Sequence, residues 1–158
     1  MKKFKNITYS FNILLTALVS GFMLFYCNSQ GRYLNFILEN NLTDGLKIFS
    51  QFIQSANPGT LVNSLLITQL LVAVLSLALN FKRRIVPGQV GAIIAPVILM
   101  ILNFATGFSQ CESSIVSGSD LSELNIQFFL KWNIPFHIIY SGSYGIASLW
   151  LIFQRGQE

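Results

Sequence analysis

Charge is scarce in this chain. Only 10% of its 158 residues are Asp, Glu, Lys or Arg, and 53% are hydrophobic, whereas about 25% of the residues are charged in an ordinary soluble domain. This composition excludes a water-soluble domain as the main body of the protein. The net charge of +4 does not indicate a nucleic-acid partner, because the basic residues lie at the ends of apolar runs and not on one water-facing surface.

Histidine and cysteine are also rare. The chain has one histidine, His137, and two cysteines, Cys27 and Cys111. A haem held by two histidines of one chain is therefore excluded, and a zinc site would lack the three or four protein ligands that it normally needs. The two cysteines do not form a CxxC pair, so thiol-redox chemistry has no support. We expect neither a cofactor nor a bound metal.

Four long apolar runs are present, at residues 7–26, 60–81, 86–108 and 128–153. Each is long enough to cross the hydrocarbon core of a bilayer as a helix. Backbone groups in lipid must be paired within the protein, which a helix achieves on its own. The sequence predicts an all-α fold, a single integral membrane four-helix bundle over residues 1–158, with the lipid bilayer as its main partner.

The basic residues predict the orientation of the spans, because Lys and Arg near span ends are retained on the cytoplasmic side. Seven of the ten flank one side of the predicted bundle: Lys2, Lys3, Lys5, Lys82, Arg83, Arg84 and Arg155. Both termini are therefore expected in the cytoplasm, with the protein in a plasma or inner membrane. A cleaved signal peptide is the alternative for the first run, but that run continues to Tyr26 without the small residues of a cleavage site.

Two outer loops follow from this topology. In residues 28–58, apolar residues recur at three- and four-residue steps, which predicts an amphipathic helical segment on the outer leaflet or over the mouth of the bundle. Residues 109–125 are rich in Ser, Gly and acid and are expected to be irregular. Cys27 and Cys111 lie on the same outer side, so a disulfide is a hypothesis that requires their Cα atoms to approach within about 4.4 to 6.8 Å.

Polar residues within the spans form rows. Those of the first two spans are expected to face protein, and they are Thr8, Asn12, Thr16, Ser20, Thr60, Asn63, Ser64, Thr68, Ser76 and Asn80. In the fourth span, helical spacing places Asn133, Tyr140 and His137 on one face. A neutral imidazole there could abstract a proton from an acidic organic substrate, with Asn103 nearby. The candidate catalytic residues are His137, Asn133, Tyr140 and Asn103; a buried structural histidine is the alternative.

Several short motifs resemble a known family. They are Gly21-Phe22, Asn57-Pro58, Asn103, Lys131-Trp132-Asn133 and His137. In this pattern the chain resembles the anthrone oxygenase-like four-helix membrane family, catalogued as domain of unknown function 1772. The resemblance implies cofactor-independent oxygenation of a polyketide anthrone, with Trp132, Asn133 and His137 at the positions that would serve the reaction.

Two classes of function follow from these features. The first is an enzyme without a cofactor, resembling an oxygenase, that acts on a lipophilic small molecule. The second is a non-catalytic membrane subunit or scaffold that binds partner helices or forms a homo-oligomer. A transporter is less well supported, because the spans carry almost no charge.

Overall fold

The computed structural model describes residues 2–81 and 86–156, except for the side chain of Lys2. In these residues the chain forms helices and no strand, so the prediction of an all-α fold is confirmed. The helices are α1 (Lys2–Asn28), α2 (Gln30–Glu39), α3 (Thr43–Ala56), α4 (Pro58–Asn80), α5 (Val86–Thr106), α6 (Phe108–Ser117) and α7 (Glu123–Arg155).

Four helical stretches are long and apolar enough to cross a membrane. They are Lys3–Glu39, Pro58–Asn80, Val86–Thr106 and Glu123–Arg155. Each contains most or all of one predicted run, and the first is longer because α2 follows α1 after a turn at Ser29. Asn57, at a positive φ of 44°, and Pro58 mark the sharp start of α4. The described chain therefore has the helices of an integral membrane protein.

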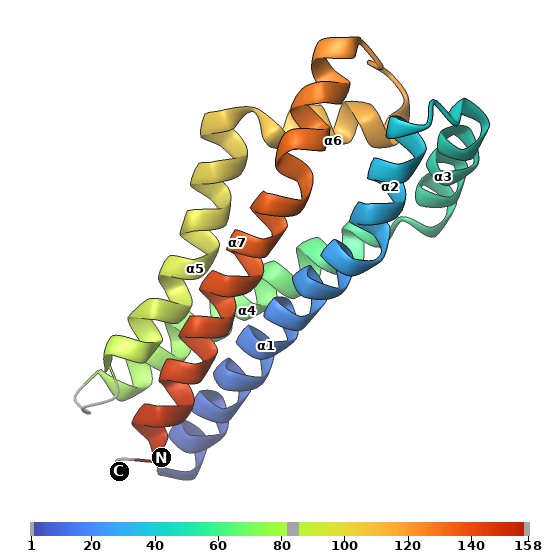
Figure 1. Ribbon diagram of the computed structural model, residues 1–158. Helices are drawn as coiled ribbons and strands as arrows, with labels where there is room; N and C mark the ends of the chain where they lie inside the picture. Colours follow the sequence, from blue (N-terminus) through green and yellow to red (C-terminus); the bar gives the residue numbers. More distant parts are fainter. Residues whose placement is uncertain (1, 82–85, 157–158) are drawn as a thin grey trace.

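The long helices pack side by side (Figure 1), with α7 against α1 and α5, and α4 against the same two helices. The hydroxyls of Ser20 and Ser141 each donate to the other residue's carbonyl, at 2.8 and 2.9 Å. A Cβ atom on Gly145 would lie 3.1 Å from Ser20 Oγ, so α1 and α7 approach closely there. Small residues and hydroxyls thus hold α1 against α7, as is common between membrane helices.

A proline in α5 has a partner that sequence reasoning missed. Pro96 has no N–H, so the carbonyl of Ala92 loses its donor within the helix. The side chain of Gln69 on α4 supplies one instead, with Nε2 at 3.1 Å from that carbonyl and 3.2 Å from Thr16 Oγ1. Gln69 is fully buried. One amide therefore joins α1, α4 and α5 where the α5 backbone is incomplete.

The predicted polar rows are only partly buried. Thr8, Asn12 and Thr16 of α1 are buried, as expected. Along α4 the prediction is wrong for the N-terminal half: Ser76 and Asn80 are buried, whereas Thr60, Asn63, Ser64 and Thr68 are exposed. The reason is that α4 is covered along one narrow face, which carries Gln69, Ala73, Ser76 and Asn80.

Three shorter helices, α2, α3 and α6, gather at the end of the molecule away from the termini (Figure 1). The expectation that residues 109–125 are irregular is wrong for their first part, because α6 occupies residues 108–117. Gly107 and Gly118, with φ of 72° and 70°, adopt left-handed conformations at its two ends. Phe108, Cys111 and Ile115, three and four residues apart, form its buried face.

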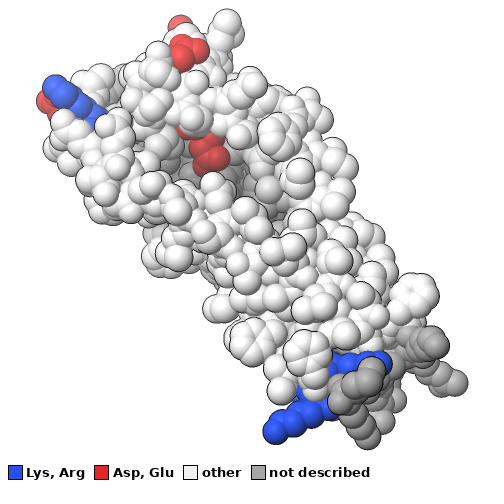
Figure 2. All heavy atoms as spheres, turned by 180° about the vertical axis from the view of Figure 1, so that it is seen from behind, with Lys and Arg blue, Asp and Glu red and all other residues white. Residues whose placement is uncertain are grey.

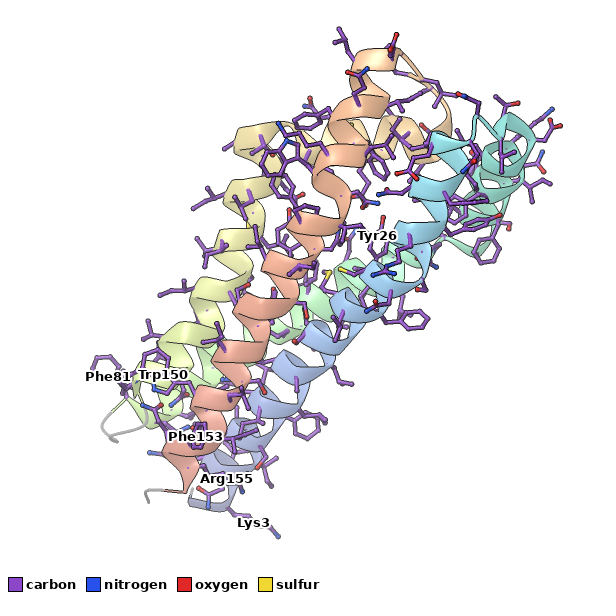
Figure 3. The ribbon with its side chains drawn as sticks, in the orientation of Figure 1. Lys3, Tyr26, Phe81, Trp150, Phe153 and Arg155 are labelled. Atoms are coloured by element: carbon purple, nitrogen blue, oxygen red, sulfur yellow. The ribbon has the colours of Figure 1, made fainter. Side chains whose placement is uncertain are left out.

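Acidic side chains are concentrated toward one end of the molecule, whereas basic side chains occur at both ends (Figure 2). Lys3 and Arg155 lie at the end that carries both termini (Figure 3), and acidic side chains gather toward the other end (Figure 2). The predicted basic hairpin of Lys82, Arg83 and Arg84 lies outside the described residues. The end that faces the cytoplasm therefore remains a prediction from the basic residues.

Candidate functional site

A cavity of about 470 Å³ lies below the three short helices. Its walls come from the C-terminal part of α1, the beginning of α4, the end of α5, one face of α6 and the middle of α7, with further residues from α2 and α3. Figure 2 shows a hollow on the flank of the molecule with acidic atoms at its floor, and Glu112 is the acidic residue among the described residues that line the cavity. The volume is that of a typical small-molecule site.

His137 contributes its imidazole to this cavity from α7 and is itself buried. Its Nδ1 lies 2.7 Å from the carbonyl oxygen of Asn133. Because a carbonyl can only accept, Nδ1 carries the hydrogen. The other nitrogen, Nε2, lies 3.8 Å from Oε1 of Glu112. The backbone of α7 thus orients the ring so that Nε2 faces a carboxylate.

Tyr26 of α1 holds the histidine and the glutamate together. Its ring stacks on that of His137, with centroids 4.1 Å apart and planes 24° apart. Its hydroxyl donates to Glu112 Oε1 at 2.9 Å. In Figure 3 Tyr26 lies well away from the end of the molecule that carries Lys3 and Arg155. The three side chains come from α1, α6 and α7, so packing of these helices assembles the cluster.

A glycine on α2 allows that helix to pack closely against Tyr26. A Cβ atom at Gly31 would lie 3.0 Å from Tyr26 Cε1 and 3.0 Å from Ile134 Cδ1. The carbonyl of Gly31 also accepts from Asn133 Nδ2 at 3.1 Å. The absence of a side chain at this position therefore allows the close contact between α2, the tyrosine ring and α7.

The other predicted catalytic residues have mixed positions. Tyr140 and Asn103 line the cavity with His137, and the Tyr140 hydroxyl donates to Asn103 Oδ1 at 3.0 Å. Asn133 is fully buried and is not among the lining residues; its amide donates to Gly31 and to Asn35 Oδ1. Asn133 thus joins α7 to α2 and positions His137 through its own carbonyl.

Trp132, which the family resemblance places with the reacting residues, lies elsewhere on α7. Its ring stacks on that of Phe136 at 5.1 Å, and Lys131 Nζ lies 5.4 Å from its centroid. Trp132 is not among the residues that line the cavity. An indole with a lysine beside it is typical of the interface between membrane and water.

Glu112 is the residue that sequence reasoning missed. It lies in a segment that composition predicts to be irregular, and its only signal is the apolar spacing of its neighbours in α6. That spacing turns one face of α6 toward the core and leaves the glutamate side chain 29% exposed in the cavity. No Lys or Arg is found among the described lining residues, so among them His137 is the group that can carry a balancing charge.

The Cys27–Cys111 disulfide is not formed in this structure, where both cysteines are buried free thiols. Cys27 approaches the carbonyl of Ile134 at 4.0 Å, and Cys111 donates to that of Asn125 at 3.4 Å. These carbonyls are nine residues apart on α7, about 13 Å along a helix, which keeps the thiols apart. Burial raises the pKa of the Cys111 thiol.

No group of three or more His, Cys, Asp and Glu side chains that could hold a metal ion occurs within residues 2–81 and 86–156. Comparisons of the chain with protein-family models, with curated proteins and with solved structures found no match. The class of the protein therefore follows from its structure alone. It is a helical protein with four helices able to span a membrane and a cavity lined by His137, Glu112 and Tyr26.

Proposed function

We propose that this protein binds a lipophilic small molecule from the outer leaflet and transfers a proton to or from it through His137 and Glu112. The observation that carries the proposal is the position of this pair inside an otherwise largely apolar cavity of about 470 Å³ that opens on the flank of the molecule. A flank opening gives access from the bilayer, where a lipophilic molecule is concentrated.

The membrane arrangement is part of the proposal. The four long helices form a transmembrane bundle with both termini in the cytoplasm, and α2 and α3 form an amphipathic lid over its outer mouth. Support comes from Lys3, Lys5 and Arg155 near the ends of the chain and from the buried stripe of Leu34, Ile37, Leu38, Leu46 and Phe49.

The chemistry is general acid–base catalysis. With its hydrogen on Nδ1, the neutral imidazole has a lone pair on Nε2 that accepts a proton from the substrate. The resulting imidazolium is stabilised on both sides, by the Asn133 carbonyl and by the Glu112 carboxylate. Tyr26 fixes the orientation of ring and carboxylate. The oxygenase reaction implied by the family resemblance is one specific form, in which the deprotonated carbon then reacts with dioxygen.

Anthrone is a suitable test compound, because it is small, lipophilic and a carbon acid. Protein in nanodiscs is incubated with anthrone in D₂O under argon, and deuterium uptake at the acidic carbon is followed by mass spectrometry. We expect His137→Gln to lower the catalysed rate by about a hundredfold or more, the range for a lost general base. Ser64→Ala, an exposed change outside the cavity, serves as the control. Equal rates for wild type and His137→Gln would refute the catalytic role, and oxygen uptake in air tests the oxygenase form.

A second candidate is a non-catalytic subunit or scaffold, favoured by the sparse cover of α4. Only 17% of the most apolar 18-residue stretch of α4 is buried, against 44% of the corresponding stretch of α7. The uncovered side carries Leu61, Ile67, Thr68 and Leu71. A stoichiometric partner or homo-oligomer after purification in mild detergent, lost on Thr68→Trp, would support this function; a monomer would argue against it.

A further inference from the structure

The charge of the cavity limits the kinds of ligand it can bind more than its shape does. Glu112 supplies a carboxylate, and among the described lining residues there is no lysine or arginine. The side chain of Glu112 is 29% exposed, so a bound molecule can reach it. In surroundings less polar than water, an unbalanced carboxylate attracts a cation and repels an anion much more strongly than it would in solution.

Aromatic rings add to this preference. Phe22, Tyr26, Phe49 and Tyr140 all line the cavity. The faces of such rings are electron-rich and attract ammonium groups, most strongly where water is excluded. A carboxylate among aromatic rings is a combination that suits a protonated amine and gives no positive partner to a carboxylate or phosphate ligand.

The rest of the cavity suits a hydrocarbon body. Met23, Val62, Leu66 and Leu99 provide apolar walls, while Asn63, Ser109 and Ser113 add polar groups. The cavity therefore offers an apolar region next to a single anionic group. A molecule that matches both has a lipophilic part and one amine.

We propose that the cavity selects lipophilic amines, bound as ammonium ions against Glu112, over neutral and anionic molecules of the same shape. This inference rests on the proposed function, namely that the cavity binds a lipophilic molecule. The ammonium group hydrogen-bonds to the carboxylate, and the apolar part lies against α4 and α5. In this position the ammonium group also lies beside His137, whose Nε2 is 3.8 Å from Glu112 Oε1.

The single histidine provides a direct readout. Protein labelled with ¹³C-histidine and purified without a histidine tag gives one imidazole signal, which comes from His137. The signal is followed in nanodiscs at fixed pH during titration with 4-phenylbutylamine, 4-phenylbutanol and 4-phenylbutyrate, three compounds that differ in charge. We expect the amine to bind about tenfold or more tightly than the alcohol, and the carboxylate to bind most weakly.

Two variants separate charge selection from binding itself. Glu112→Gln keeps an acceptor for the Tyr26 hydroxyl but removes the charge, and we expect it to abolish the preference for the amine while the alcohol still binds. Glu39→Gln removes an exposed charge outside the cavity and should leave all affinities unchanged. Equal binding of the three compounds, or an amine preference that survives Glu112→Gln, overturns the inference alone. No binding of any compound overturns the proposed function as well.

Discussion

The hydrogen bond from Gln69 to the Ala92 carbonyl should be coupled to the proline that makes it necessary. Pro96 deprives this carbonyl of its helical donor, and Gln69 Nε2 replaces that donor at 3.1 Å. In Gln69→Leu the side chain keeps a similar size, but the carbonyl is left unpaired in the interior. An unpaired buried acceptor costs about 1 to 3 kcal/mol, and measured hydrogen bonds between membrane helices average about 0.6 kcal/mol.

We therefore expect Gln69→Leu to lower the free energy of unfolding by about 1 to 2 kcal/mol. In a Pro96→Ala background, residue 96 regains an N–H that can donate to the Ala92 carbonyl within α5. There the same Gln69→Leu change should cost about 1 kcal/mol less, since only the bond to Thr16 is then lost.

Equilibrium unfolding in mixed micelles, followed by circular dichroism, measures all four members of this cycle. Gln51→Leu, at an exposed position of α3, is the control and should change stability by less than about 0.5 kcal/mol. A coupling energy smaller than about 0.3 kcal/mol would refute the reasoning, because it would mean that the amide does not substitute for the missing donor of the proline.

Three further predictions follow from close contacts and burial. Gly31→Ala should displace the Tyr26 ring, shift the His137 signal and lower the free energy of unfolding by about 1 kcal/mol, because overpacking outweighs the gain in helix propensity. Gly21→Ala, where a Cβ atom would have no neighbour within 4 Å, should have none of these effects. An unshifted signal in Gly31→Ala would contradict the close contact. Cys111 should react slowly with an alkylating reagent in folded protein at pH 8 and faster as the pH rises, because its raised pKa keeps the thiol protonated. After unfolding without reductant, Cys27 and Cys111 should each take one alkyl group, and fewer than two groups would indicate a disulfide. Ser20→Ala should lower stability by about 0.6 kcal/mol through its lost bond to α7, with exposed Ser64→Ala as the neutral comparison in the same unfolding assay.

The sequence alone was sufficient for the helices that can span a membrane. Runs such as residues 86–108 are apolar over the full thickness of a bilayer, and backbone hydrogen bonding in lipid leaves a helix as the structure for a single run. The start of α4 was also signalled locally, by Asn57-Pro58. These properties depend on neighbours in the chain, which the sequence states directly.

Part of the candidate site was also visible in the sequence. Helical spacing along α7 places His137 and Tyr140 on one face, and both line the cavity. The same spacing included Asn133, whose side chain instead joins α2. Helical periodicity gives the direction in which a side chain points, but not which neighbouring helix meets it.

Tertiary structure alone decided which side chains meet. Glu112 is 25 residues from His137 in the chain, and Tyr26 is farther still, yet the packing of α6 and α1 against α7 brings them together. Gln69 likewise gains its role only because α4 passes the carbonyl that Pro96 leaves free. The scarcity of charge in the sequence was enough to indicate helices that can cross a membrane. The position of one carboxylate beside the only histidine depended on the folded arrangement, because contacts between distant segments are set by packing and not by local pattern.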